Sequence, residues 1–522
     1  MDTDVLIVGA GPTGLMLANQ LGRRGIRAEI IDRHDGPAQQ TRALGVQART
    51  LDIYAHLGID KKAIEWGKKG VGADMWARGK RAAHVPFNAI GMDLTPYPYL
   101  LILGQDDNEK LMGEALRQWN LPIGWKTELV ALAQENDRVR ATLKQPDGTS
   151  REITAAWVAG CDGARSSVRE MNGIDFVGAP YEHVFFVADT EMTGPMVADE
   201  MNIYLWRGGF HLFFPLRGTD HWRLVGILPK SMRARDDLTL DDVIPSIKEE
   251  AGAALTVRGC RWFSTYRIHH RRAAQFRRGR CFVLGDAAHV HSPVGAQGMN
   301  TGLQDAYNLA WKLGLVVSGR ADTALLDSYE RERLPVAERL LSTTDSLFSI
   351  IVSDTTLAGL FRRYVMPRML AVAMKIDRVR KTFFRSIAQL GIRYRRSALS
   401  VTPQQWPEEA PRGGDRFPWL KVKLSAGGSP EDIFDKLDDT RFNLVVIGQE
   451  APQSLPPRVA ELMQVLVIPS DPANDPALER AKIPRPSFYL LRPDCYVGLC
   501  GASPEADAIA RYFTKRMGIR SK

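Results

Sequence analysis

Residues 4–14 read DVLIVGAGPTG, and this stretch decides the fold. Residues 5–8 form a continuous apolar run, which is typical of a buried parallel strand. A glycine turn follows, then helical apolar spacing over residues 15–24 and a second short strand over residues 27–31. Residues 4–32 therefore predict one βαβ unit at the start of a parallel sheet.

The glycines of this turn have the spacing GxGxxG, as Gly9, Gly11 and Gly14, and Asp32 ends the second strand. Glycines permit a tight turn and a close backbone approach, the helix N-terminus presents N–H groups to a pyrophosphate, and the acid accepts from a ribose hydroxyl. We expect a dinucleotide site here, with a ligand-free structural turn as the alternative. The motif does not separate FAD from NAD.

Two further motifs follow predicted strands. Residues 160–169 read GCDGARSSVR, and residues 285–289 read GDAAH and lead to PVGAQGMNTG at residues 293–302. With three motifs in this order, the chain closely resembles the flavoprotein aromatic hydroxylases, the single-component FAD monooxygenases with the p-hydroxybenzoate hydroxylase fold. The resemblance implies that the first motif holds FAD, that FAD and the nicotinamide donor meet at the middle one, and that Asp286 binds the ribitol chain.

The resemblance implies a set of FAD contacts along the chain. Arg33 and Arg42 match basic residues near the ribose and pyrophosphate, and the backbone of Val130 is expected at the adenine. The full set is Gly9, Gly11, Thr13, Gly14, Asp32, Arg33, Arg42, Gln105, Val130, Asp162, Asp286, Pro293, Gly295, Gly298, Met299 and Asn300.

A helix is expected to begin within residues 295–300, with Met299, Leu303, Ala306 and Leu313 on one face. Its positive end would stabilise the anion of the reduced flavin. The alternative is a helix cap without a ligand. Ala296 stands where many relatives have a second glycine.

The substrate site is predicted from residues 203–214. A two-residue turn at Gly208-Gly209 would pair Trp206 with His211 and Tyr204 with Phe213 on one face of a hairpin. The face with Ile203, Leu205, Leu212 and Phe214 is then expected in the core, and the first face is expected to bind a flat aromatic ligand. On this reading Trp206 and Phe213 bind the substrate, His211 is the candidate base and Tyr204 positions the substrate. A half-exposed sheet face without a ligand is the alternative.

The 522 residues suffice for about three domains of roughly 150 residues each, and the pattern predicts the α/β class. The resemblance implies a Rossmann-like FAD domain, an inserted β-sheet substrate domain and a thioredoxin-like C-terminal domain. The expected boundaries are 1–73, 104–178 and 268–345 for the FAD domain, 74–103 and 179–267 for the substrate domain, 346–413 for a helical connection and linker, and 414–522 for the C-terminal domain. Cys495 and Cys500 form no CxxC pair, so a redox dithiol is not expected.

Composition excludes several classes of protein. Apolar residues make up 44% and charged residues 25%, which excludes wholesale disorder and fibrous structure. No apolar run approaches the length of a membrane span, and the first residues lack a basic leader, so a cytoplasmic protein is expected. The five cysteines have no metal or disulfide pattern and are expected as mostly buried thiols.

The net charge of +9 has a local origin. Residues 361–397 contain eleven Lys or Arg and one acid, and the other residues sum to −1. A general nucleic-acid role is therefore not expected. We interpret the segment as a solvated helical surface, although its interleaved apolar residues would also suit an anionic bilayer.

The expected activity follows from the resemblance. NAD(P)H, as NADPH or NADH, would reduce FAD, O2 would add at flavin C4a, and the hydroperoxide would hydroxylate a phenolic or polyketide-like aromatic. Baeyer–Villiger or oxidative decarboxylation chemistry on the same fold and a non-catalytic FAD-binding sensor remain alternatives. The chain lacks the Trp-x-Trp-x-Ile-Pro signature of flavin halogenases, so that activity is less expected. It also has no nucleophile elbow that would indicate a hydrolase.

The histidines of the third motif, residues 329–335 and the oligomeric state are the remaining features of the sequence. His289 and His291 lack further ligands for zinc, so no metal is predicted. Residues 329–335, YERERLP, resemble the closing helix motif of the family, and we expect packing and ion pairing from them. The oligomeric state is open, with a homodimer as one possibility.

Overall fold

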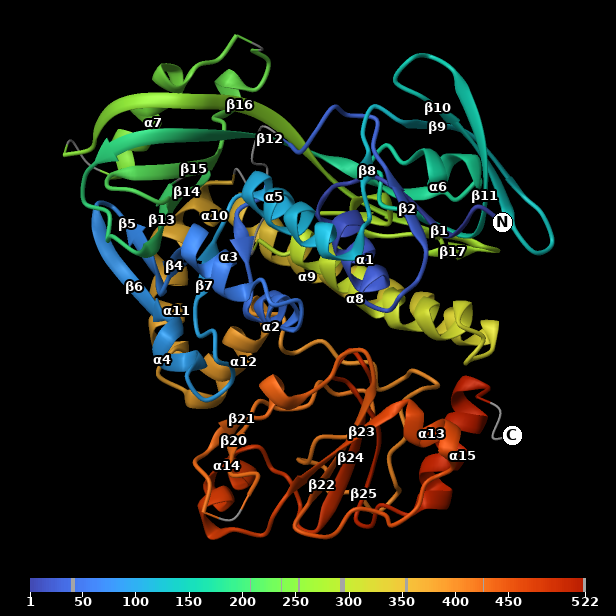
Figure 1. Cartoon of the computed structure of the whole chain (residues 1–522). Helices are drawn as coiled ribbons and strands as arrows, with labels where there is room; N and C mark the ends of the chain where they lie inside the picture. The colour runs from blue at the N-terminus through green and yellow to red at the C-terminus, as the bar shows by residue number, and fades with distance from the viewer. Residues whose placement is uncertain are drawn as a thin grey trace.

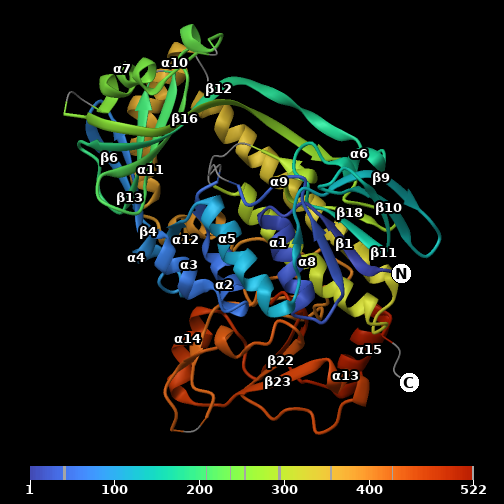
Figure 2. The ribbon, with the colours of Figure 1, turned by 45° about the horizontal axis from the view of Figure 1, so that its top comes forward.

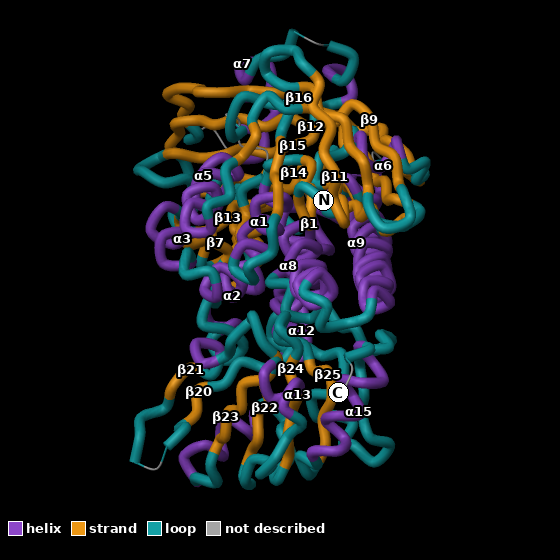
Figure 3. The backbone as a smooth tube through the Cα atoms, turned by 45° about the vertical axis from the view of Figure 1, so that its right-hand side comes forward, coloured by secondary structure: helices purple, strands orange, loops and turns teal. Residues whose placement is uncertain are grey.

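The computed structural model describes residues 1–38, 43–206, 208–235, 237–251, 254–291, 296–352, 355–425 and 427–519. Figure 1 shows three parts: a sheet near the N-terminus at the upper right, a second sheet at the upper left, and a C-terminal domain at the bottom. Helices α8 (Gly298–Val317) and α9 (Asp327–Val352) lie between the sheets and the C-terminal domain. Figure 3 shows the same helices above the C-terminal sheet from the side.

The first sheet forms around the predicted βαβ unit. Its order is β17-β18-β11-β1-β2-β8, and β1 pairs in parallel with β2 and β11. Residues 5–7 of β1 have no exposed surface, as expected of a central parallel strand. The strands are β1 (Thr3–Val8), β2 (Ala28–Ile31), β8 (Ile123–Gly124), β9 (Glu128–Gln134), β10 (Val139–Lys144), β11 (Ser150–Gly160), β17 (Arg277–Arg278) and β18 (Cys281–Val283).

The second sheet has the order β19-β16-β12-β15-β14-β13-β5-β6 and is antiparallel except for the parallel pair β13 and β5. Two 18-residue strands, β12 and β16, run across the predicted domain boundaries at 178/179 and 267/268 and join the two parts. The strands are β5 (Gly72–Ala77), β6 (Lys80–Pro86), β12 (Phe176–Thr193), β13 (Glu200–Trp206), β14 (Gly209–Pro215), β15 (His221–Ile227), β16 (Thr256–Ala273) and β19 (His289–Val290). A small sheet of β3 (Gly45–Val46), β7 (Leu100–Ile102) and β4 (Lys68–Gly70) accompanies it.

Helices cover both sheets (Figure 2). They are α1 (Pro12–Gly22), α2 (Ala48–His56), α3 (Asp60–Trp66), α4 (Phe87–Gly91), α5 (Gln105–Leu116), α6 (Ser167–Met171), α7 (Leu240–Ala251), α10 (Thr356–Leu360), α11 (Met366–Ala373) and α12 (Asp377–Ile387). The expected helix after the third motif is α8, which begins at Gly298 and is buried on all sides over residues 300–314, not on one face. Among the described residues, no helix has the length and apolar character that a membrane crossing requires.

The C-terminal domain has the predicted thioredoxin-like arrangement of a mixed sheet with flanking helices. Strand β22 (Phe442–Ile447) pairs in parallel with β23 (Met463–Ile468) and antiparallel with β24 (Ser487–Leu491), which pairs with β25 (Val497–Gly501). Smaller elements are β20 (Lys421–Val422), β21 (Glu431–Asp432), α13 (Pro457–Glu461), α14 (Asp475–Arg480) and α15 (Ala506–Met517). All five cysteines are free thiols, and all but Cys260 are buried. Burial raises the pKa of Cys495 and of Cys500 to about 12, so both thiols stay protonated at neutral pH.

A buried ion-pair network fastens the C-terminal domain to the helices. Arg492 donates to both carboxylate oxygens of Glu332 on α9, at 2.6 and 2.9 Å, and Lys312 of α8 lies 2.8 Å from the same carboxylate. These three side chains have no exposed surface. Burial alone would raise the pKa of Glu332, but the Arg492 and Lys312 charges hold it well below its usual value. The ion-pairing role expected of residues 329–335 is confirmed at Glu332.

The first prediction concerns this network. Arg492→Ala leaves the Glu332 carboxylate buried with less compensation, and we expect a loss of about 3 to 5 kcal/mol in the free energy of unfolding. The matched control is Lys436→Ala, which removes the exposed pair with Glu431 and should cost at most about 1 kcal/mol. Thermal unfolding of the three proteins measures both effects. Equal melting temperatures for the two variants would contradict the assigned role of Arg492.

Candidate functional site

The first motif leaves space at one glycine only. A Cβ on Gly9, whose φ is +105°, would lie 2.3 Å from the Cys161 carbonyl oxygen, and a Cβ on Gly14 would lie 1.9 Å from the Gly9 carbonyl oxygen. These two glycines are required by the close approach of β1, α1 and the end of β11. A Cβ on Gly11 would meet nothing within 4 Å. The space next to Gly11, at the N-terminus of α1, fits a pyrophosphate.

The turn after β2 closes the other side of this space. The Asp32 carboxylate accepts from the Ala10 N–H at 2.7 Å and from the His34 N–H at 2.9 Å, so it ties the glycine turn to the end of β2. Arg33 is exposed beside it, and Val130 is 43% exposed on β9. Arg42 lies outside the described residues.

A cavity of about 490 Å³ lies between this turn and the start of α5. Gln105 is the first residue of α5, and its amide donates to Glu109, which also accepts from the Ala38 N–H. The lining residues are Asp35, Gly36, Pro37, Ala38, Asp106 and Lys110. The cavity lies next to Arg33 and Gln105 in sequence and has room for the adenosine end of a dinucleotide.

The middle motif joins the first sheet to the third motif. Asp162 accepts from the Ser166 hydroxyl at 2.5 Å and from the Val168 N–H at 3.1 Å, so its carboxylate caps the start of α6. Burial raises its pKa. Arg169 donates to the Ala287 carbonyl oxygen at 3.1 Å. Contact between Asp162 and FAD stays a prediction, because these bonds give its side chain a structural role already.

The third motif packs directly on the first. A Cβ on Gly285 or on Gly302 would lie within 2.5 Å of the Thr13 hydroxyl, so the start of α1 and the end of β18 meet at Thr13. Asp286 is exposed next to this contact, where a carboxylate can accept from ribitol hydroxyls. Pro293 and Gly295 lie outside the described residues.

The start of α8 is fixed by Asn300. Its side-chain oxygen accepts from the Gln47 N–H at 3.0 Å and from Thr50 at 2.7 Å, and its amide donates to Gly45 and Ala296 carbonyl oxygens. The Asn300 side chain therefore positions the neighbouring loops and is already occupied by protein partners. Gly298 begins the helix, and Met299 packs partly buried against the core.

Ala296 adopts the left-handed conformation, with φ at +52°. Glycine adopts this conformation more readily than alanine does, which accounts for the glycine that many relatives have at this position. The residue nevertheless accepts two amide donors, from Asn300 and Gln47, at its carbonyl oxygen. These two bonds hold Ala296 in this conformation although the residue is not a glycine.

Sequence reasoning missed Asp305, which holds the third motif in place. This fully buried carboxylate on α8 accepts from the Gly285 N–H at 3.0 Å, from His289 at 2.7 Å and from Arg333 at 2.6 Å. Burial alone would raise the pKa of Asp305, but Arg333 and His289 hold it below its usual value. Its signal in the sequence was an acid within the helix expected after the third motif, because a buried acid requires a partner.

The predicted hairpin register is wrong by two residues. Tyr204 pairs with His211 and Trp206 with Gly209, because Gly209 is the first residue of β14 and not a turn residue. Phe213 pairs with Asn202. The predicted division of faces holds, because a shift of two residues keeps every side chain on its side of the strand.

The structure buries the face on which the pocket was predicted. Tyr204 and Phe213 pack in one core cluster with Leu240, Val243 and Ile247 of α7, so a helix covers the face on which the pocket was predicted. Trp206 stacks on His211 on this face, with ring centroids 5.6 Å apart. The alternation of residues along the strands predicted which side chains share a face. It did not indicate which of the two faces α7 covers.

His211 is placed unfavourably for its predicted role as a base. The side chain has no exposed surface, and neither ring nitrogen has a hydrogen-bond partner among the described residues. Burial lowers the pKa of His211 to about 3. The imidazole is therefore a neutral core residue beside Phe186 and Trp206, without access to a substrate hydroxyl.

The opposite face of the sheet is only half covered. Its partly buried side chains pack around a small cluster that includes Leu205 and Phe210, and Met366 of α11 reaches the same cluster. The half-buried members on the strands are Met75, Ile203, Leu212, Phe214, Trp262 and Tyr266. Arg223, also on this face, pairs with Asp189 at 2.5 Å and lies over the Trp262 ring.

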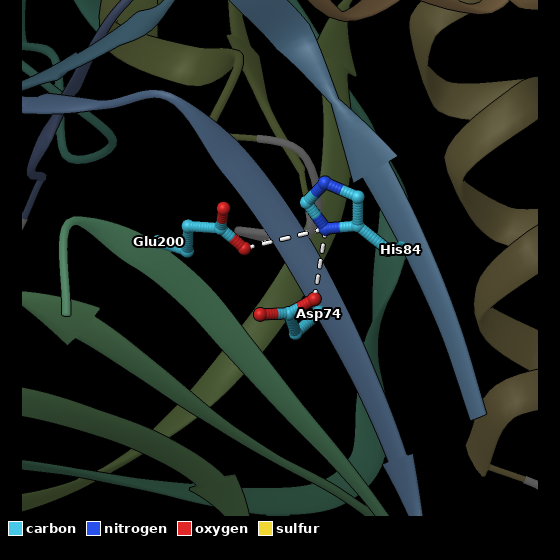
Figure 4. Close-up of side chains that lie close together, drawn as sticks. All are labelled: Asp74, His84 and Glu200. Atoms are coloured by element: carbon cyan, nitrogen blue, oxygen red, sulfur yellow. Dashed lines mark hydrogen bonds and ion pairs between the residues drawn. The ribbon is translucent and has the colours of Figure 1, made fainter. Parts of the chain in front are cut away.

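A charged cluster lies at the far edge of the same sheet (Figure 4). His84 Nδ1 of β6 is 2.9 Å from an Asp74 oxygen of β5 and 3.3 Å from a Glu200 oxygen of β13. Burial, with Asp74 nearby, raises the pKa of Glu200 to about 7. Among the described residues, these three side chains are the one group of His, Cys, Asp or Glu whose ligand atoms lie close enough together to hold a metal ion. The Arg81 guanidinium contacts all three, so a cation of the chain itself already compensates the carboxylates.

These features define an FAD-binding flavoprotein, in which the glycine-rich βαβ turn, the end of β18 before Asp286 and the buried helix α8 meet at Thr13. Residues 2–344 match the family described as FAD binding domain, and the chain belongs to that family.

Known proteins resemble the chain over nearly its full length. The 6-methylpretetramide 4-monooxygenase of Streptomyces rimosus is 33% identical over 523 residues, which cover 95% of this chain and 90% of the relative. The solved anhydrotetracycline hydroxylase of Streptomyces rimosus covers 99% of both chains at 27% identity, with a TM-score of 0.77. A ternary complex of aklavinone-11 hydroxylase with FAD and aklavinone covers 99% of both chains at 25% identity, with a TM-score of 0.81. The chain is thus an FAD-dependent monooxygenase.

The second prediction separates the glycines of the first motif. Gly11→Ala adds a methyl group where the protein leaves open space. The free energy of unfolding of the apoprotein should therefore stay within about 1 kcal/mol of the wild-type value. FAD affinity should fall more than tenfold, because each displaced hydrogen bond to a charged phosphate is worth about 1.5 to 3 kcal/mol. Fluorescence titration of the apoprotein with FAD measures this.

Two controls accompany that experiment. Gly113→Ala, also without a neighbour within 4 Å of the added Cβ, should change neither property appreciably, and Gly14→Ala should destabilise the fold. Unchanged FAD affinity in Gly11→Ala would show that the pyrophosphate lies elsewhere.

Proposed function

We propose that this monooxygenase uses NAD(P)H and O2 to hydroxylate a phenolic or polyketide-like aromatic substrate. The observation that carries the proposal is the half-buried apolar face of the second sheet, whose strand β14 contacts β4 and α9. When bound, FAD accepts the hydride and activates O2 for transfer of one oxygen atom to the ring. Relatives named for tetracycline precursors and the aklavinone complex support a ligand with several fused rings.

The proposed pocket lies on the face opposite to His211. Three ring side chains, Phe214, Trp262 and Tyr266, provide flat contact surface, and Met75, Ile203 and Leu212 provide aliphatic surface. Such a lining binds a flat aromatic ligand through apolar contact and excludes water from the reacting atoms.

One end of this face is polar. The Arg223–Asp189 pair lies beside Trp262, and Arg223 is only 3% exposed. Burial raises the pKa of Tyr266, which therefore keeps its proton and can donate a hydrogen bond to a substrate oxygen. We propose that these groups orient the oxygenated edge of the substrate.

The third prediction tests which face binds the substrate. Ile203→Trp fills the half-buried face and should raise KM for an accepted aromatic at least tenfold, since contacts with the pocket wall are displaced. FAD content and melting temperature should stay near the wild-type values. The matched control is the next residue on the covered face: Tyr204→Phe removes a hydroxyl that has no partner among the described residues and should leave KM unchanged.

The assay is NADPH and NADH consumption with a panel of phenols and fused-ring aromatics, followed by product mass spectrometry. Stimulated consumption with a product that has gained one oxygen atom supports the proposal. Ring expansion or loss of carbon dioxide would indicate Baeyer–Villiger or decarboxylation chemistry instead. A KM that responds to Tyr204→Phe but not to Ile203→Trp would place the pocket on the α7 face.

A further inference from the structure

The helices after α9 expose apolar side chains on their outer side. Of the fifteen large apolar side chains that are exposed among the described residues, eight lie within residues 357–379. Leu357 is 80% exposed, Val372 62% and Met369 59%. We call these eight residues the apolar stripe: Leu357, Leu360, Tyr364, Val365, Met369, Val372, Ile376 and Val379.

Six of the eight stripe residues lie on one continuous helix, and Ile376 and Val379 follow at the start of α12. Residues 356–373 form α10, a π-helical turn over residues 361–365 and α11 without interruption, and α12 follows at residue 377. Spacings of three and four residues between stripe members put them on the same side of this helix. The inner side holds the buried Gly359, Arg362, Pro367 and Met374. An apolar face of this size turned to solvent marks an interaction surface.

Basic residues from two distant segments surround the stripe. Arg368, Lys375 and Arg378 are exposed within it, and Asp377 is compensated by Arg380 and Lys381. The turn between β5 and β6 adds exposed Arg78 and Lys80, and the Arg78 guanidinium lies 5.4 Å from the centre of the Tyr364 ring. We call Arg78, Lys80, Arg368, Lys375 and Arg378 the basic rim.

We propose that the apolar stripe and the basic rim bind the surface of an anionic lipid bilayer. Large apolar side chains inserted at the acyl boundary and basic side chains at anionic headgroups are the two requirements of interfacial binding. A second copy of the chain suits the surface poorly, because two such faces would bring together two segments of net charge +10. The expected solvated surface does not account for the outward apolar face.

The same helix also borders the proposed pocket. Met366 packs in the cluster of the half-buried sheet face, while its neighbours Val365 and Met369 belong to the stripe. A bilayer bound at the stripe would therefore lie one helix away from the pocket. This consequence rests on the proposed function, but lipid binding itself can be measured without any turnover.

The test is flotation of the FAD-loaded protein with vesicles of phosphatidylcholine alone and of phosphatidylcholine mixed with phosphatidylglycerol. We expect binding to the mixed vesicles at low salt and its loss at high salt. Arg368→Gln, Lys375→Gln and Arg378→Gln combined should weaken binding about 100-fold, at about fivefold for each basic residue. Met369→Ser with Val372→Ser should weaken it at least tenfold.

Controls keep the outcomes distinct. Met92→Ser with Val177→Ser removes two exposed apolar side chains outside the stripe and should leave binding unchanged. FAD content and oxygenation of a water-soluble substrate should be equal in all variants, so a failed proposed function would show in turnover and not in flotation. No flotation with anionic vesicles, equal binding to both vesicle types, or stripe variants that instead dissociate a dimer would overturn the proposal.

Discussion

The carboxylate of Asp305 is the constraint on which the flavin site depends. It is fully buried on α8 and is satisfied by a backbone N–H and an imidazole from residues 285–289 and by a guanidinium from α9. A buried charge with this many partners is stable, whereas the loss of one partner exposes the full cost of its desolvation. The acid thus fixes the spacing between β18, which precedes Asp286, and α8, the two elements at which the flavin contact is predicted.

From Asp305 the same logic extends to the C-terminal domain. Arg333 also donates to the Tyr394 hydroxyl at 2.8 Å, and the carboxylate of the neighbouring Glu332 accepts from the Arg492 guanidinium. Adjacent residues of α9 therefore connect the third motif on one side and the thioredoxin-like domain on the other. These contacts and its two buried, protonated thiols support the packing role predicted for the C-terminal domain.

Much of this arrangement could be predicted from the sequence, for identifiable reasons. The βαβ unit and the three motifs depend on local patterns, in which glycines, strand ends and helix starts occur close together. The register of β13 and β14 could not be predicted, because two glycines in succession allow two turn positions. Which face α7 covers depends on residues 240–251, far from the hairpin in sequence. Asp305 was missed because its partners, Gly285, His289 and Arg333, come from two segments separate from its own neighbours in sequence.

Oxygen transfer is the central claim, and isotope-labelled dioxygen tests it most directly. The FAD-loaded protein is supplied with NAD(P)H, an aromatic that stimulates its consumption, and labelled O2 in unlabelled water. We predict that each hydroxylated product molecule gains one labelled oxygen atom. A product without the label, or NAD(P)H consumption that yields only hydrogen peroxide with every aromatic tested, would contradict the account.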